Sequence, residues 1–246
     1  MEIRGRTCLV TGATGGIGRA VAERLATGGA VLVLTARDGE ALASLAATTG
    51  GRVAAADLTR PEEVERLAAE AGPVDVLVHA AGEGHLGVCA KLAPERLEHL
   101  VALNVTAPIE LTDALLPGML ERGRGHVVFV GSIAGRVGRG REAAYAATKG
   151  AVSVFADSLR AEVRGTGVEV LLVTPGAVAT RFFERRGTPY DRRWPRPVPA
   201  ERVAEALVDG IEAGRAEITV PRWLGLPVRL RGAAPGLFRE LAARFD

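Results

Sequence analysis

The stretch Thr11-Gly12-Ala13-Thr14-Gly15-Gly16-Ile17-Gly18 decides the fold of this chain. It follows a short apolar run at 6–11 and precedes an alanine-rich segment with helical spacing at 17–28. A strand, a glycine-rich turn and a helix in this order are typical of a site for the diphosphate of a dinucleotide. Gly12 suits the tight turn, Gly16 lets the backbone approach the diphosphate, and Gly18 lets the helix pack close to the strand. The first helical turn then offers unpaired N–H groups and the positive end of the helix dipole.

Outward from this motif, apolar runs of strand length alternate with amphipathic segments of helix length. The expected strands lie near 6–11, 30–36, 51–56, 75–80, 125–131, 168–174 and 216–220. The expected helices lie near 17–28, 38–48, 61–71, 94–121, 143–164, 200–213 and 235–244. Continuous apolar runs such as Val-Val-Phe-Val indicate parallel strands covered on both faces. The alternation predicts an α/β fold with a doubly wound, mostly parallel seven-stranded sheet and helices on both faces.

Length and composition limit the possible functions. A chain of 246 residues suits one α/β domain, 1–246, and a net charge of +2 is too small to indicate a nucleic-acid partner. Two cysteines give no disulfide framework. The N-terminus has no apolar signal core, and no run approaches the length of a membrane span. We therefore expect a cytoplasmic protein without a transmembrane segment, and no motif indicates a metal site.

Tyr145 and Lys149 stand four residues apart in Tyr-Ala-Ala-Thr-Lys, within a segment expected to be helical. Residues at this spacing lie on one face of a helix, so the phenol and the ammonium can point into one cavity. A nearby cation favours phenolate, so we expect Lys149 to lower the pKa of Tyr145. A shift from about 10 to neutral pH corresponds to roughly 4 kcal/mol. Such a phenol would exchange a proton with an alcohol or a ketone.

Together, Thr-Gly-x-x-x-Gly-Ile-Gly at 11–18, Tyr-x-x-x-Lys at 145–149 and Ser132, thirteen residues before the tyrosine, resemble the short-chain dehydrogenase/reductase family in its non-extended branch. The resemblance spans about residues 5–180. It implies a Rossmann-type fold and hydride transfer between a nicotinamide and a carbonyl carbon. In this family Tyr145 would give or take the proton, and Lys149 would also bind the nicotinamide ribose. Ser132 would orient the substrate oxygen, and Asn104 would order a water beside Lys149.

The cofactor preference is expected at the end of the second strand. An NAD enzyme wants an acid there for the ribose 2′-OH, but position 36 is alanine and Arg37 follows. Arg37 suits a 2′-phosphate, so we predict NADP over NAD, although Asp38 next to it complicates the charge. By resemblance, Asp57 contacts the adenine. His79-Ala80-Ala81-Gly82 replaces the family's usual Asn-Asn-Ala-Gly, which puts the usual support of that loop in doubt.

We interpret His79 as a hydrogen-bonded core residue rather than a catalyst. After the sixth strand, Pro175 and Gly176 turn the chain across the cofactor. The resemblance places the Val178 backbone and the Thr180 hydroxyl on the nicotinamide carboxamide. The complete set of predicted cofactor contacts is Gly12, Thr14, Gly16, Ile17, Gly18, Arg37, Asp57, Leu58, Ala81, Gly82, Tyr145, Lys149, Pro175, Gly176, Val178 and Thr180.

Substrate contacts are expected from the loops 83–93, 133–142 and 177–199. Phe182, Phe183, Tyr190 and Trp194 gather in the last loop, although aromatic residues make up only 4% of the chain. We interpret 177–199 as a lid over an apolar pocket, with a packed loop or subunit contact equally open. Arg136, Arg139 and Arg141 flank the expected active site. They either attract an acidic substrate or lie on a solvated loop, and the solvated loop is favoured.

The C-terminal extension 221–246 departs from the carrier-protein reductases of the family, which usually end soon after Val-Asp-Gly-Gly. It would cover the pocket, pack on a second subunit or touch a membrane, and packing is favoured. We predict an NADP-dependent reductase or dehydrogenase of a small-to-medium apolar ketone, aldehyde or alcohol, acting as a homodimer or homotetramer. The alternatives are a 3-oxoacyl-carrier-protein reductase and a non-catalytic redox sensor that binds a dinucleotide.

Overall fold

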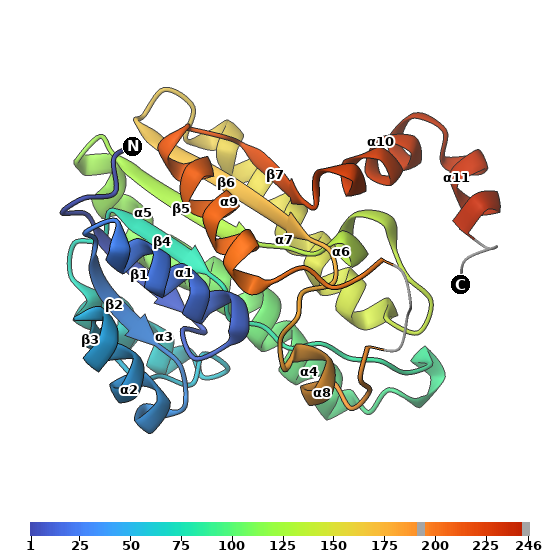
Figure 1. Cartoon of the computed structure of the whole chain (residues 1–246), viewed down its shortest axis with the longest axis horizontal. Helices are drawn as coiled ribbons and strands as arrows, with labels where there is room; N and C mark the ends of the chain where they lie inside the picture. Colours follow the sequence, from blue (N-terminus) through green and yellow to red (C-terminus); the bar gives the residue numbers. More distant parts are fainter. Residues whose placement is uncertain (191–194, 243–246) are drawn as a thin grey trace.

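The computed structural model describes residues 1–190 and 195–242. Its centre is a seven-stranded sheet in the order β3-β2-β1-β4-β5-β6-β7 (Figure 1), and every neighbouring pair of strands is parallel. The strands are β1 (Thr7–Thr11), β2 (Val31–Thr35), β3 (Arg52–Val53), β4 (Val76–His79), β5 (Gly125–Val130), β6 (Val168–Pro175) and β7 (Glu217–Val220). The predicted doubly wound α/β fold is confirmed. The strand order reverses between β1 and β4, where such sheets bind ligands.

Helices cover both faces of the sheet. They are α1 (Gly16–Thr27), α2 (Gly39–Thr49), α3 (Pro61–Ala71), α4 (Pro94–Val101), α5 (Ala107–Glu121), α6 (Ile133–Val137), α7 (Ala143–Glu162), α8 (Phe182–Arg185), α9 (Ala200–Glu212), α10 (Gly225–Ala233) and α11 (Pro235–Ala242). Two short 3₁₀ turns, η1 (Cys89–Lys91) and η3 (Arg222–Leu224), and a π-helical turn, η2 (Ala102–Thr106), complete the elements.

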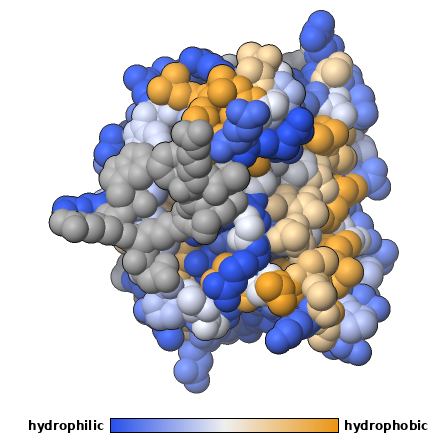
Figure 2. All heavy atoms as spheres, turned by 90° about the vertical axis from the view of Figure 1, so that its right-hand side faces the viewer, coloured by the Kyte–Doolittle hydropathy of each residue, from blue (hydrophilic) through white to orange (hydrophobic). Residues whose placement is uncertain are grey.

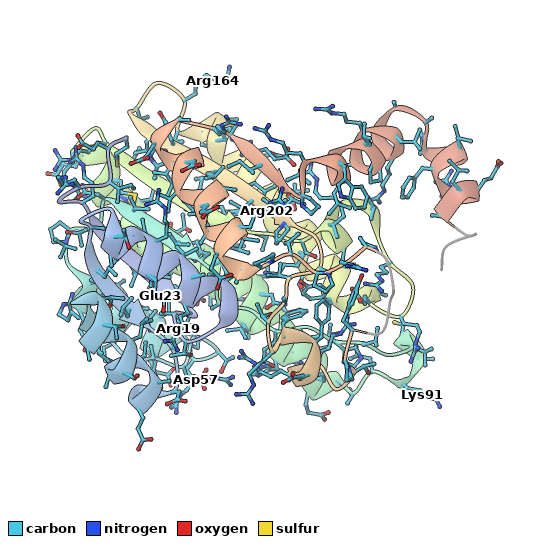
Figure 3. All side chains as sticks on the ribbon, viewed as in Figure 1. Arg19, Glu23, Asp57, Lys91, Arg164 and Arg202 are labelled. Carbon is cyan, nitrogen blue, oxygen red and sulfur yellow. The ribbon has the colours of Figure 1, made fainter. Side chains whose placement is uncertain are left out.

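The core has two layers because successive strand residues point to opposite faces of the sheet. In β1, Cys8 and Val10 pack with α1, α2 and α9, whereas Leu9 packs with α3, α5 and α7. In β5, Val128 and Phe129 divide between the two layers in the same way. Charged side chains occupy the outer helix faces. An example is the Arg19–Glu23 ion pair of 2.9 Å, one turn apart on α1 (Figure 3).

Two expected elements differ in the structure. The third strand was expected over 51–56, but only Arg52 and Val53 pair with β2, and both are exposed. The helix expected over 94–121 is interrupted by the π-helical turn η2, whose wider hydrogen-bonding pattern admits an extra residue. The helices α6, α8 and α10 were not predicted, because they are short or weakly amphipathic.

The helical segment Pro94–Glu121 is long and apolar enough to cross a membrane by length and composition alone. The sequence prediction, which considered continuous apolar runs, did not identify this segment. However, Leu100, Leu111 and Met119 on this segment are almost fully buried, and the last two pack in the layer beneath α3 and α7. The segment therefore behaves as a core helix.

The C-terminal arm, 221–242, leaves the end of β7 and extends away from the sheet (Figure 1). Its first turn packs inward, because Leu224 is 6% exposed. Further along, Leu226 is 65% exposed and Leu237 is 51% exposed. Seen from the side that carries the arm, hydrophobic residues gather at the top and along the right-hand side of the view, with hydrophilic residues around them (Figure 2). The arm is thus anchored at its beginning and exposed beyond it.

Candidate active site

A single large cavity of about 630 Å³ lies at the carboxyl ends of the strands. It contains every predicted cofactor contact on its wall, together with Ser132. Of the four predicted catalytic residues, Asn104 alone stands behind the wall, against Gly82. Residues from β1, β2, β4, β5, β6 and α7 meet here because parallel strands end at one edge of the sheet.

The glycine turn has the geometry of a phosphate cradle. Gly12 adopts φ +62°, the left-handed region that favours glycine, and a Cβ there would lie 2.7 Å from backbone atoms of Ala81. A Cβ on Gly18 would lie 2.2 Å from the Gly12 carbonyl oxygen, so only glycine lets α1 start this close to β1. The N-cap, Gly15, offers no side-chain hydrogen bond to the first turn of α1. These N–H groups therefore remain available to a diphosphate.

Gly16 lines the cavity as predicted and has a second, steric role. A Cβ on Gly16 would lie 2.2 Å from the Thr180 methyl group. The glycine makes room for the chain that follows β6, which crosses over the turn. The diphosphate contact of Gly16 stays a prediction, whereas the contact with Thr180 could not be predicted from the sequence.

The loop after β4 is held without the two asparagines that the family usually has. The Thr11 hydroxyl accepts hydrogen bonds from the N–H groups of Ala80 and Ala81, both at 3.1 Å. His79 is fully buried, lies 2.9 Å from the Thr112 hydroxyl and stacks on Phe129. Burial, reinforced by Lys149, lowers the pKa of His79 to about 3, so the ring is neutral. The prediction of a hydrogen-bonded core histidine is confirmed, and Thr11 is the support that sequence reasoning missed.

Arg37 stands at the end of β2 as predicted, but it is not a free cation. Its Nη2 lies 2.9 Å from Glu83 Oε1, and its side chain is 57% exposed. The other carboxylate oxygen of Glu83 binds Arg96 at 2.9 Å and His99 at 3.3 Å. Burial acts to raise the pKa of Glu83, but hydrogen bonds and charges from Arg96 and His99 outweigh it and lower the pKa. Glu83 was missed, since no local signal links residues 46 positions apart.

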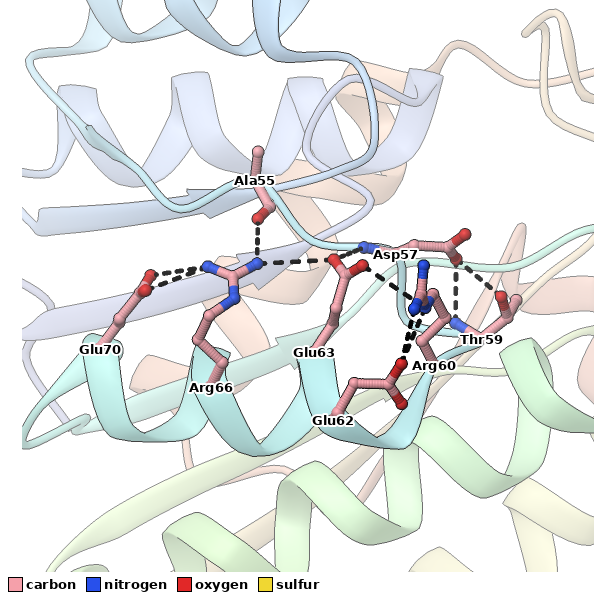
Figure 4. Close-up of polar contacts among 8 residues, drawn as sticks. All are labelled: Ala55, Asp57, Thr59, Arg60, Glu62, Glu63, Arg66 and Glu70. Atoms are coloured by element: carbon pink, nitrogen blue, oxygen red, sulfur yellow. Dashed lines mark hydrogen bonds and ion pairs between the residues drawn. The ribbon is translucent and has the colours of Figure 1, made fainter.

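Asp57 lines the part of the cavity that also contains the glycine turn and Arg37, here called the nucleotide end. It belongs to a network of charges at the start of α3 (Figure 4). Its Oδ1 accepts hydrogen bonds from the Thr59 N–H at 3.0 Å and the Thr59 hydroxyl at 2.8 Å. Slight burial opposes ionisation, but these bonds outweigh it and lower the pKa of Asp57. Glu63 accepts from the Asp57 N–H at 2.8 Å and fixes this backbone. A carboxylate held in this way presents its remaining oxygen to a donor in the cavity.

Ser132, Tyr145 and Lys149 converge on the opposite part of the cavity wall. Ser132 follows β5 and caps α6, where its hydroxyl accepts from the Ala134 N–H at 3.2 Å. The phenol of Tyr145 lies within hydrogen-bonding reach of the Ser132 hydroxyl. Lys149, one turn further along α7, donates from Nζ to the Val130 carbonyl at 3.0 Å. All three residues are at least nine-tenths buried.

The predicted lowering of the tyrosine pKa is wrong for this structure. Burial raises the pKa of Tyr145 to about 12, and Ser132 and Arg186 offset it only partly. Burial also lowers the pKa of Lys149 to about 8. Both shifts have the same cause, since a low-dielectric cavity disfavours either charged form. At neutral pH the tyrosine is therefore a phenol and the lysine is still largely an ammonium.

Asn104 belongs to the π-helical turn η2 and is 1% exposed. Its amide donates to the Glu83 carbonyl at 2.9 Å and the Thr148 hydroxyl at 3.0 Å, and its Oδ1 accepts from the Glu83 N–H. A Cβ on Gly82 would lie 3.1 Å from this oxygen and 3.2 Å from Lys149 Nζ. Asn104 thus lies behind the cavity wall, where it fixes the loop that faces Lys149. Asn104 and Lys149 both border Gly82, and the side chain of Asn104 bonds to protein groups; that it orders a water beside Lys149 stays a prediction.

The segment after β6 forms the upper wall. Pro175 ends the strand, and the Gly176 N–H donates to the Val220 carbonyl at 2.8 Å. A short parallel bridge joins Val178 to Val198 and closes the base of the predicted lid. Thr180 accepts from the Phe182 N–H, which starts α8. Phe182 stands 5.6 Å from the Tyr145 ring, between centroids, and Phe183 lies 4.9 Å from Tyr190. The fourth aromatic, Trp194, lies outside the described residues.

The three arginines predicted to flank the site differ in their contacts. Arg136 pairs with Glu217 at 3.3 Å, and its carbonyl accepts from Arg231 of the C-terminal arm. The Arg141 carbonyl accepts from the Gly87 N–H and joins two substrate loops. Arg139 pairs with Glu142 at 3.2 Å and lines the cavity, so it is more than the solvated residue that was favoured.

Comparison with known proteins supplies the family. The short chain dehydrogenase family model matches residues 6–191. An uncharacterized oxidoreductase of Myxococcus xanthus is 36% identical over 99% of this chain and 98% of its own. The 1-deoxy-11-beta-hydroxypentalenate dehydrogenase of Streptomyces exfoliatus is 38% identical over 87% of this chain and 82% of its own.

Solved structures agree with these sequence matches. A Sphingobium yanoikuyae short-chain dehydrogenase in complex with NADPH has a TM-score of 0.84 and 31% identity, covering 94% of this chain and 95% of the other. A Burkholderia phymatum short chain dehydrogenase/reductase in complex with NAD has a TM-score of 0.87 and 26% identity, covering 96% of both chains. The chain therefore belongs to the short-chain dehydrogenase/reductase family and is an oxidoreductase acting on CH–OH groups.

Proposed function

We propose that the protein is an NADP(H)-dependent oxidoreductase that interconverts a carbonyl and an alcohol on an apolar ketone or aldehyde. The observation that carries this proposal is the convergence of Ser132, Tyr145 and Lys149 on one cavity whose other end is a glycine turn. When bound, the nicotinamide ring supplies or accepts the hydride. The protein positions the substrate oxygen and manages the proton.

In the reduction, we assign proton donation to the Tyr145 hydroxyl. A pKa raised to about 12 keeps this hydroxyl protonated at neutral pH. The Ser132 hydroxyl orients the substrate oxygen from the same wall. As the phenol loses its proton, the Lys149 ammonium compensates the developing negative charge across the shared cavity. Asn104 and Thr148 keep the loop at Gly82 in place behind Lys149.

The preference for NADP rests on Arg37 and on Ala36, which leaves no acid at position 36, where an NAD enzyme would have one. A 2′-phosphate carries more charge than the Glu83 carboxylate and would take Arg37 from it. Glu83 would keep Arg96 and His99 as partners after this exchange. The exchange therefore leaves no carboxylate unpaired, which supports NADP as the cofactor.

Phe182, Phe183 and Tyr190 support an apolar substrate, because they line the cavity beside Tyr145. We further propose that 1–246 form one catalytic domain with 177–199 as its lid, in a cytoplasmic homodimer or homotetramer. The exposed apolar residues of the C-terminal arm support self-association. Light scattering on the purified protein tests this assembly, and a monomer at micromolar concentration contradicts it.

The direct test of the function is loss of NADPH absorbance with ketones and aldehydes of graded size, beside 3-oxoacyl thioesters of matched chain length. We expect turnover of the free apolar ketones. Turnover of the thioesters alone would instead support a carrier-protein reductase. Binding of NADPH without turnover of any carbonyl compound would contradict an enzyme of this class.

A further inference from the structure

The lid end of the cavity contains a buried group of three charges, here called the Arg–Glu–Arg triad: Arg139, Glu142 and Arg186. Arg186 Nη1 lies 2.6 Å from Glu142 Oε1, and their side chains are 5% and 3% exposed. Arg139 Nη1 lies 3.2 Å from the same oxygen, with its side chain 26% exposed. One carboxylate therefore faces two guanidinium groups, and the triad retains a positive charge. All three residues line the cavity.

The two ends of the cavity differ in charge. At the nucleotide end, Asp38, Asp57 and Glu83 stand with Arg37. At the lid end, Glu142 is the one carboxylate on the described wall, beside Arg139, Lys149, Arg181, Arg185 and Arg186. Of these, Arg181 also has a surface partner, Glu184, at 3.5 Å. Arg181 and Arg185 are exposed, so the largely buried excess of positive charge in the substrate region comes from the triad and Lys149. The apolar aromatic residues do not explain this charge.

Arg186 is held so that part of its guanidinium remains available. Nε donates to the Thr188 carbonyl at 3.4 Å, Nη1 binds Glu142, and Cζ lies 4.6 Å above the Phe183 ring. Nη2 forms no hydrogen bond with the described residues. A guanidinium fixed on two sides with a donor to spare is preorganised for an incoming anion.

The triad lies close to the reacting group. Glu142 immediately precedes α7, and Tyr145 lies three residues further, about 5 Å along the helix axis. The centroid of the Phe182 ring lies 5.6 Å from that of Tyr145 and 5.6 Å from that of Phe183. Because the Arg186 guanidinium lies over the Phe183 ring, the two phenylalanines connect Tyr145 to Arg186. A molecule that extends along the cavity from Tyr145 to the triad would contact the phenol first, then the phenylalanine rings and finally the guanidinium groups.

We propose that Arg186, assisted by Arg139, binds a carboxylate of the substrate, so that the substrate is an apolar oxo acid or hydroxy acid whose carboxylate lies several bonds from the reacting carbon. This rests on the proposed function and specifies its substrate class. Glu142 keeps the two arginines in position before the substrate arrives. The substrate carboxylate then pairs with the charge that Glu142 leaves unmatched.

The test compares medium-chain oxo acids with their methyl esters, which differ only in the charge. For the wild type we expect higher kcat/KM with the acids, and for Arg186→Met we expect the acid-to-ester ratio to fall about 100-fold. Arg186→Lys should recover part of the ratio. Arg202→Met, a charge loss on the exposed face of α9, should leave it unchanged. A wild-type enzyme without preference for the acids, or a parallel loss for acids and esters in Arg186→Met, would overturn the proposal.

Binding separates this proposal from the proposed function. Calorimetry of the same acids with NADP-loaded Tyr145→Phe should show binding that Arg186→Met in the same background weakens, while the esters bind weakly to both. If the acids bind in this Arg186-dependent way but the wild type turns over no substrate, only the proposed function is contradicted. If the wild type turns the acids over but Arg186→Met does not weaken their binding, only the proposed carboxylate site is contradicted.

Discussion

The nucleotide end and the lid end of the cavity are built in different ways. At the nucleotide end, the motif is short in sequence, since Gly12, Gly16 and Gly18 follow β1 directly and each is required to lack a Cβ. At the lid end, the decisive pair joins Glu142 to Arg186, 44 residues apart. Local backbone requirements leave a motif in the sequence, whereas pairs of side chains between distant loops leave none. The predictions below test this difference.

The largest expected effect is Gly18→Val. Its Cβ would lie 2.2 Å from the Gly12 carbonyl, so the turn must move, at a cost of about 3 kcal/mol or more. Gly39→Val is the matched control, because it also lies in the first turn of a helix but has no atom within 4 Å. Thermal unfolding and NADPH titration check the result. Equal effects of the two substitutions would show that the close approach of Gly18 to the Gly12 carbonyl matters neither for stability nor for NADPH binding.

Arg37→Gln should weaken NADPH binding about tenfold to 100-fold and leave NADH binding nearly unchanged, because only NADPH presents a phosphate to the guanidinium. Fluorescence titration with both cofactors gives the two dissociation constants. Arg60→Gln, a nearby exposed arginine on which no cofactor contact is predicted, serves as the control. Equal losses for both cofactors would contradict the 2′-phosphate role.

The pH dependence of ketone reduction should have one descending limb. Lys149 loses its proton above its pKa of about 8, whereas Tyr145 keeps its proton up to about 12. The cation that compensates the developing phenolate is therefore lost first, and kcat/KM should fall about tenfold per pH unit above pH 8. The assay uses an uncharged ketone, so that the substrate itself does not titrate over the pH range. A rate that stays level to pH 10 would contradict the role of the Lys149 charge.

The smallest expected effect concerns the carboxylate that pairs with Arg37 at the nucleotide end. Glu83→Gln removes the carboxylate that pairs with Arg37 and should increase NADPH affinity several-fold by removing this competition, with little change for NADH. Glu62→Gln, on the exposed start of α3, is the control. Weaker NADPH binding in Glu83→Gln would show that Glu83 organises Arg37 and does not compete for it.

The sequence predicted the fold and the nucleotide end well, since apolar runs and glycine spacing are local signals. It also placed Ser132, Tyr145 and Lys149 on one wall, because a single helix and the adjacent strand end position them. It failed on the tyrosine pKa, which depends on burial by Phe182 and on Lys149 turning to the Val130 carbonyl. The charges of Glu83 and Glu142 escaped notice, because their partners are defined only by the folded chain.

The central claim is that Tyr145 transfers the proton in a cavity that Ser132 and Lys149 share. The most direct measurement is Tyr145→Phe, with NADPH oxidation on the best ketone followed beside NADPH binding by titration. Loss of the hydroxyl should reduce kcat at least about 1,000-fold while the dissociation constant for NADPH changes little. Turnover close to that of the wild type, with the cofactor still bound, would contradict the account.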